Sequence, residues 1–173
     1  MNMPPDDDFD TFFRTRSPAL LRAAYLLTGD RHLAEDLVQE ALARTHLAWS
    51  RLRAEGSPEA YTRRIMYNLQ VSRWRRGKFA EVRTDRVPEA RYHQDEAGAA
   101  VNRLAMRRAL GTLPVRQRAA VILRYFEDRS EAETAEILGC RIGTVKSHLS
   151  RGIARLRELL PDLSDSGVEG ASR

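Results

Sequence analysis

One segment in the first half of the chain combines basic and aromatic side chains. Residues 60–80 contain six basic residues and no acidic residue. Aromatic faces stack on unpaired bases, and arginines hold the phosphate backbone. On a helix, one face and its borders would carry Arg63, Tyr67, Gln70 and Trp74, with Arg64 and Arg73 beside them. The pattern favours a surface for single-stranded DNA. The alternative is that Tyr67 and Trp74 are core residues of a small helical bundle.

A second pattern, near the end of the chain, is typical of a helix-turn-helix. Ser130 and Glu133 form a capping-box sequence that opens a short helix, and Gly139 can end it in a left-handed conformation. A three-residue turn leads into a longer helix, whose small polar and basic residues could approach base edges and phosphates in a major groove. Its outer stripe carries Thr144, Ser147, His148, Arg151 and Arg155, with Lys146 at the flank. The pattern predicts duplex DNA binding, with a helical hairpin as the alternative.

A third candidate surface is acidic. In the helix expected after Asp30, the apolar residues form one buried stripe. Asp36, Gln39 and Glu40 lie off that stripe, on a domain that is otherwise basic. This face is either a solvated helix surface or a docking surface for a basic protein partner.

Other kinds of chemistry find little support. The four histidines (His32, His46, His93 and His148) are scattered, and Cys140 is the single cysteine. A hydrolase or nuclease needs clustered carboxylates or histidines near a nucleophile. We therefore expect no enzymatic activity, no metal and no cofactor. No apolar run approaches the roughly 20 residues of a membrane span, and the N-terminus is acidic, so an intracellular, cytoplasmic protein without membrane insertion is expected.

The elements that must position these residues are all predicted to be helices. Spacings of three and four recur in two blocks, whereas period-two alternation is almost absent. The 173 residues suffice for two small domains. Their net charge is +5, and 27 of the 29 basic residues are arginines. We predict an all-α fold of two helical domains with a flexible linker and a disordered tail: 9–76, linker 77–102, 103–160 and tail 161–173. The first helix is expected from Ser17 to Leu27, with Gly29 at its C-terminal cap and Asp30 as the cap of the next helix. Phe126 is expected in the core of the second domain, and Ser72 is expected to point inward from the basic segment.

Three stretches in this order carry a family resemblance: LTGDRHLAEDLVQEAL, RRIMYNLQVSRWRR and LPVRQRAAVILRYFEDRSEAETAEILGCRIGTVKSHLSRGIARLRELL. Together they closely resemble bacterial sigma factors of the sigma-70 family. The best match is the short two-domain kind called extracytoplasmic-function sigma factors, and within it the actinobacterial SigE-type subgroup. The resemblance covers roughly residues 9–160.

The resemblance implies a role for each candidate surface. Asp36, Gln39 and Glu40 would bind the β′ clamp helices of core RNA polymerase, and the β flap is a further implied contact. The segment 63–76 would recognise and melt the −10 element, with Asn68 at a position the family often uses. The helix-turn-helix would read the −35 element, and the loop near residues 50–57 would help to capture a flipped base. An alternative-promoter role and an anti-sigma partner are also implied.

Three residues depart from the family pattern. Ser72 stands where many relatives carry Asp, and Ile142 stands where Val is usual. Arg141 replaces a Ser that would cap the recognition helix, which could weaken the helix start by about 1 kcal/mol or supply a phosphate contact.

A LuxR-type regulator is the rival interpretation, because GTVKSHL also suits that helix-turn-helix. Its usual receiver domain would show alternating strands and helices, which the first block lacks.

Overall fold

The protein is entirely helical over the residues that its structure describes. In this computed structural model they are residues 5–80 and 97–160, and they contain no strand, which confirms the all-α prediction. The helices are α1 (Pro5–Thr28), α2 (Arg31–Leu47), α3 (Trp49–Glu55), α4 (Pro58–Ala80), α5 (Ala97–Thr112), α6 (Val115–Val121), the π-helical turn η1 (Ile122–Phe126), α7 (Glu131–Leu138) and α8 (Ile142–Leu159). None of them is both long and apolar enough to cross a membrane.

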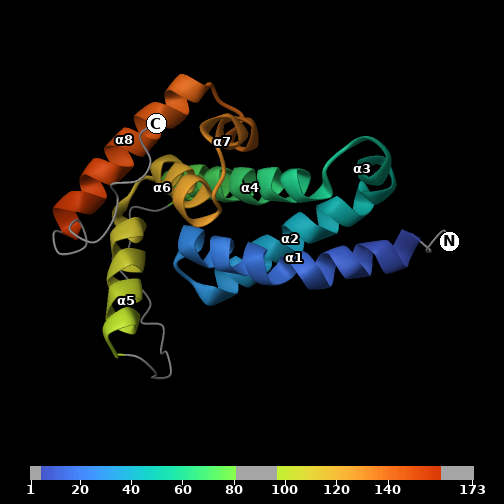
Figure 1. The fold of residues 1–173 in the computed structure, drawn as a ribbon, viewed down its shortest axis with the longest axis horizontal. Helices are drawn as coiled ribbons and strands as arrows, with labels where there is room; N and C mark the ends of the chain where they lie inside the picture. Colours follow the sequence, from blue (N-terminus) through green and yellow to red (C-terminus); the bar gives the residue numbers. More distant parts are fainter. Residues whose placement is uncertain (1–4, 81–96, 161–173) are drawn as a thin grey trace.

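The first domain is a helical hairpin with a third long helix across it. Helices α1 and α2 lie side by side, and α4 packs on both (Figure 1). Gly29 has a φ of +76° at the turn, as its glycine identity predicted. Asp30 then caps α2 by accepting a hydrogen bond of 2.9 Å from the backbone N–H of Leu33.

Helix α1 is longer than predicted. The expected start was Ser17, but the helix begins at Pro5 and contains Pro18. Proline lacks the N–H that the preceding turn would accept, so it normally marks a helix start. Here Phe9 and Phe12 pack on Trp49, with ring centroids 5.1 and 5.2 Å apart, and this tertiary contact stabilises the turns before the proline.

The second domain is built around close packing of α6, α7 and α8. Ser130 and Glu133 form both hydrogen bonds of the predicted capping box, and Gly139 ends α7 at a φ of +62°. Gly152 of α8 lies so near α6 that an added Cβ would meet Cγ2 of Val121 at 2.9 Å. A side chain at this position would therefore push the two helices apart.

One burial prediction in this domain is wrong. Phe126 was expected in the core, but its side chain is 46% exposed. The chain widens into a π-helical turn at Ile122–Phe126, and the N–H of Glu127 bonds to Ile122 O, five residues back, at 3.0 Å. The wider turn changes which residues face inward after it. Phe126 consequently faces solvent and Glu127 is turned toward α4.

The two domains pack against each other. Helix α4 contacts α6 and α7, and α1 contacts α5 and η1 (Figure 1). Arg118 joins them by donating hydrogen bonds to three backbone carbonyls: Leu27 O at 2.7 Å, Gly111 O at 2.7 Å and Leu113 O at 3.1 Å. The predicted linker is helical at both ends, and its middle, 81–96, lies outside the described residues, as does the predicted tail.

Candidate nucleic-acid interface

The outer stripe of α8 is largely open to solvent. Val145, Leu149 and Leu156 are buried, which turns the opposite side of the helix outward. Of the predicted residues on that side, His148 is half-buried and the others are exposed: Thr144, Lys146, Ser147, Arg151 and Arg155. Burial lowers the pKa of His148, and the charges of Arg116 and Arg151 lower it further. The imidazole therefore stays neutral at neutral pH, and the stripe offers cations and small polar groups together.

The start of α8 lacks the cap that α2 and α7 have. Arg141 occupies the N-cap position with extended backbone angles, and its side chain makes no capping hydrogen bond. Ile142 is exposed directly after it. The structure thus agrees with the expectation that Arg141 does not cap this helix.

The predicted DNA-facing stripe of α4 is largely covered by the second domain. Arg63 is 6% exposed and Tyr67 is 0% exposed. The shared exposed face expected for these two residues with Gln70 and Trp74 is therefore wrong, because α6 and α7 of the second domain pack against α4. Gln70 is half-buried and Trp74, at the far end, is 41% exposed. For Tyr67 the alternative of a core residue is confirmed, and that core lies between the domains.

Glu127 of the second domain is the partner of both buried residues. Its carboxylate accepts 2.7 Å hydrogen bonds from Nε of Arg63 and from the hydroxyl of Tyr67. Arg63 also pairs with Glu59 of its own helix. Burial alone would lower the pKa of Arg63, but the charges of Glu127 and Glu59 outweigh it and raise the pKa. Burial and the same carboxylate raise the pKa of Tyr67 well above its usual value, so its hydroxyl remains a donor.

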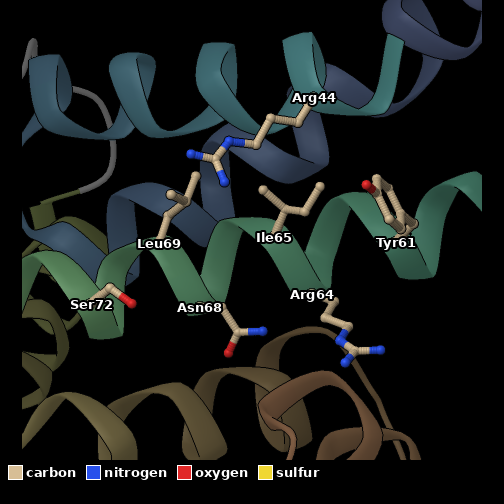
Figure 2. Close-up of a pocket in the computed structure, with 7 residues that line it drawn as sticks. All are labelled: Arg44, Tyr61, Arg64, Ile65, Asn68, Leu69 and Ser72. Carbon is tan, nitrogen blue, oxygen red and sulfur yellow. The ribbon is translucent and has the colours of Figure 1, made fainter. Parts of the chain in front are cut away.

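A neighbouring stripe of α4 remains accessible. It lines a cavity of about 250 Å³ formed by Arg44, Tyr61, Arg64, Ile65, Asn68, Leu69 and Ser72 (Figure 2). Arg44 reaches from α2 toward α4, and Ile65 and Leu69 point toward α2. Arg64 and Asn68 extend from the other side of α4 and are exposed. The cavity therefore has an apolar floor with cationic, amide and hydroxyl groups around it.

A second cavity lies where this stripe meets the second domain. Its volume is about 410 Å³, and Tyr61 and Arg64 line it as well as the first cavity. From α7 it receives two acidic side chains, Glu133 and Glu136. The accessible stripe of α4 is thus bordered by negative charge on the side of α7.

The acidic surface of α2 is only partly free. Asp36 and Gln39 are exposed. Glu40 instead forms ion pairs of 2.6 Å with Arg44 and with Arg73 of α4. The hydrogen bond from Arg73 is the main cause that lowers the pKa of Glu40. Arg73, predicted to contact DNA, therefore links α2 to α4.

The comparisons with known families decide the identity. Residues 12–79 match Sigma-70 region 2, and residues 103–156 match Sigma-70, region 4. The chain belongs to the sigma-70 family of RNA polymerase sigma factors. The region 2 match extends over α1, α2, α3 and α4, and the region 4 match extends from α5 into α8. The presence of both regions in one chain favours the sigma-factor interpretation over the LuxR-type regulator.

Curated relatives agree with this assignment. This sigma factor is 42% identical to the RNA polymerase sigma-E factor of Streptomyces coelicolor, over 96% of this chain and 94% of the relative. It is 35% identical to the ECF RNA polymerase sigma factor SigM of Mycobacterium tuberculosis, over 88% and 76%. These names place it in the extracytoplasmic-function group.

Solved structures share the fold. The sigma factor RpoE of Bartonella quintana, crystallised with the anti-sigma factor NepR, matches with a TM-score of 0.66 and 30% identity, over 89% of this chain and 97% of that one. CnrH in complex with the cytosolic domain of CnrY matches with a TM-score of 0.64 and 20% identity, over 91% and 90%. The second likeness shows the fold alone.

Sequence reasoning missed part of the cavity in region 2 of this sigma factor. Tyr61 and Arg44 were not singled out, and Ser72 was assigned to the inward side, yet all three line the cavity. Tyr61 precedes Arg64 by three residues and Asn68 by seven, so the helical spacing that joins them was present in the sequence. The described residues contain no cluster of three or more His, Cys, Asp or Glu that could hold a metal ion.

Proposed function

We propose that this sigma factor binds core RNA polymerase and directs it to promoters whose −10 and −35 elements are recognised by its two domains. The observation that carries the proposal is that one chain contains both matched regions in order, 12–79 and 103–156. A protein that only bound an operator would need the helix-turn-helix alone. We further propose that it acts in the cytoplasm at alternative promoters, as its relatives in the extracytoplasmic-function group suggest.

In the first domain, the accessible stripe of α4 suits the single-stranded −10 element. Tyr61 offers an aromatic face, Arg64 a cation and Asn68 an amide, around a cavity of about 250 Å³. Stacking on an aromatic ring and contact with arginine hold unpaired bases and their backbone. Trp74 extends the surface toward the end of the helix, while Arg63 and Tyr67 become accessible only when the second domain moves away.

In the second domain, α8 suits the double-stranded −35 element. The hydroxyls of Thr144 and Ser147 lie near its N-terminus, where a recognition helix approaches base edges. Arg151 and Arg155 lie one and two turns further along, where cations reach phosphates. The residues at the uncapped start of α8, 141–144, are exposed and leave room for this approach.

The protein partners follow from the remaining surfaces. Asp36 and Gln39 present an acidic and amide-bearing face on α2, which suits the basic clamp helices of the polymerase β′ subunit. The second domain is the part that would reach the β flap. An anti-sigma factor is a further proposed partner, supported by the likeness to a sigma factor crystallised with one.

Run-off transcription tests the proposed function. Purified protein added to core polymerase should yield a specific transcript from a promoter fragment, which genomic selection with the reconstituted holoenzyme can supply. Core polymerase alone and the protein alone are the controls, and neither should produce the transcript. Tight and specific binding to duplex DNA without core polymerase, together with no transcript in its presence, would instead support an autonomous regulator.

A further inference from the structure

Arg44 of α2 reaches into the cavity beside α4. The other lining residues all belong to α4: Tyr61, Arg64, Ile65, Asn68, Leu69 and Ser72. In Figure 2 the side chain of Arg44 extends from α2 toward this helix. It is 53% exposed, so an incoming ligand can reach it. The helix that carries the proposed polymerase-binding face therefore also contributes a cation to the proposed −10 surface.

Glu40 holds the guanidinium of Arg44 in an ion pair. Its carboxylate bonds to Arg44, one turn further along α2, and to Arg73 of α4, at 2.6 Å each. One negative charge thus lies between two positive charges, at the contact between the two helices. The carboxylate lowers the electrostatic potential that Arg44 presents to an anion in the cavity.

The pair between Glu40 and Arg44 is open to competition. The side chain of Glu40 is 36% exposed, and exposed ion pairs contribute little to stability because water and salt screen them. A phosphate accepts hydrogen bonds from an arginine fork in the same way as a carboxylate does. Arg44 can therefore exchange Glu40 for the phosphate of a strand that lies in the cavity.

Glu40 also lies beside the face proposed for polymerase. It follows Asp36 by four residues, and residues four apart on a helix are neighbours on its surface. The side chain of Asp36 is exposed. A basic side chain of the clamp helices that approached Asp36 would also attract the carboxylate of Glu40. The charge of Glu40 would then be shared with polymerase, and Arg44 would be held less strongly.

We propose that Arg44 binds a backbone phosphate of the single-stranded −10 element, and that Glu40 restrains this arginine until polymerase engages the acidic face of α2. The proposal rests on the proposed function, because it adds a contact to the same cavity. Helix α2 then serves both partners, polymerase through Asp36 and Glu40 and DNA through Arg44. The cavity gains positive charge when core polymerase binds, which favours loading of the strand after the holoenzyme has formed.

The first experiment compares Glu40→Gln with Glu35→Gln in the full chain. Both changes remove one negative charge from α2 and break an ion pair between residues four apart, since Glu35 pairs with Arg31 at 2.8 Å. Arg31 precedes Arg44 by about 20 Å along the helix and does not line the cavity. Binding of a labelled single-stranded DNA oligonucleotide of mixed sequence is measured by fluorescence anisotropy. Glu40→Gln should bind about three- to tenfold more tightly than wild type, and Glu35→Gln should gain less than about twofold.

A second change shows which cation carries the gain. In the Glu40→Gln background, Arg44→Gln should cancel most of the increase in affinity. It should also reduce the slope of log affinity against log salt concentration by about 0.7, the value for one phosphate contact with a single strand. Arg31→Gln in the same background removes the same charge and should leave both the gain and the slope unchanged. A purely structural role of Arg44 would lower the affinity without changing the slope.

Core polymerase should have the same effect as the loss of the Glu40 charge. Arg44→Gln, in an otherwise wild-type chain, is compared as free protein and as holoenzyme, with core polymerase alone as the background. The loss of affinity for the oligonucleotide should be about three- to tenfold larger in the holoenzyme than in the free protein. Arg31→Gln should show no such difference.

The outcomes separate this proposal from the proposed function. If Glu40→Gln binds DNA no better than Glu35→Gln does, Glu40 does not restrain Arg44. A gain that survives Arg44→Gln, or an equal effect of Arg44→Gln with and without core polymerase, would also overturn the proposal, even if the wild-type protein supports transcription. Failure of the wild-type protein to give a transcript with core would instead count against the proposed function.

Discussion

At the scale of single residues, neighbouring side chains on α4 differ in their exposure to solvent. Arg63 and Tyr67 are buried against the second domain, whereas Arg64 and Asn68, one position further along, stay exposed. Both pairs belong to the basic segment, and helical spacing alone cannot rank two adjacent stripes. The deciding residue is Glu127, which lies 60 positions after Tyr67 in the chain. The sequence therefore identifies the helix, but a distant contact selects its accessible face.

The polymerase-binding face offers a prediction at the same scale. Asp36→Arg should abolish binding to core polymerase while leaving the fold intact, because Asp36 is exposed and a like charge would then meet the basic clamp helices. Glu40 is less suitable for this test, since its reversal would also break the ion pairs with Arg44 and Arg73. Core binding is measured by gel filtration or by anisotropy of the labelled sigma factor.

Asp10→Arg is the matched control for Asp36→Arg. It makes the same reversal at another exposed acid of the first domain, on α1, outside the proposed interface. Core binding should be retained in this variant. If Asp36→Arg binds core as well as Asp10→Arg does, this face of α2 is not the polymerase-binding surface.

At the scale of elements, local chemistry explains which helix boundaries were predictable. Gly29 and Gly139 adopt positive φ values, and Asp30 and Ser130 cap the helices that follow, all as their residue types indicated. The start of α1 was not predictable, because it depends on aromatic packing against Trp49. The π-helical turn was also missed, since a regular period of 3.6 residues was assumed throughout.

The contact between α6 and α8 carries a prediction about stability. Gly152→Ala should lower the free energy of unfolding by about 1–3 kcal/mol, because its Cβ would meet Cγ2 of Val121 at 2.9 Å in a packed interface. Gly143→Ala in the same helix is the control, as nothing lies within 4 Å of its Cβ. That change should be neutral or stabilising by about 0.4–1 kcal/mol. Urea denaturation measures both, and equal effects would mean that α8 does not pack on α6 as described.

At the scale of the whole molecule, the sequence predicted two helical domains but not their docking. Each domain has periodic apolar stripes of its own, and these indicate a core without indicating what covers the remaining surface. Docking depends on isolated polar residues from distant positions, such as Glu127 and Arg118, whose types are ordinary on a protein surface. Only their three-dimensional surroundings show that both are largely removed from water.

Arg118 offers a test of whether the two domains unfold as one cooperative unit. Burial lowers the pKa of its guanidinium, and it donates to backbone carbonyls at the ends of α1 and α5. Arg118→Ala would leave these carbonyls, of which Leu27 O is partly buried, without this donor, at a cost of about 1–3 kcal/mol. We expect the calorimetric unfolding of the free protein to change from one cooperative transition to two, one for each domain.

Arg116→Ala is the control for this change. It removes an arginine two positions earlier on the same helix, where the side chain is exposed. A single transition should persist in this control. A single transition in Arg118→Ala as well, with an unchanged midpoint, would show that Arg118 does not couple the domains.

The π-helical turn has a consequence for comparing relatives. A turn of this kind accommodates one residue more than a regular helix of the same length. A relative that lacks one residue between positions 122 and 126 would form a regular helix there, and its acid at the place of Glu127 would rotate away from α4. A single gap in a pairwise alignment at these positions therefore marks relatives in which this acid does not reach α4.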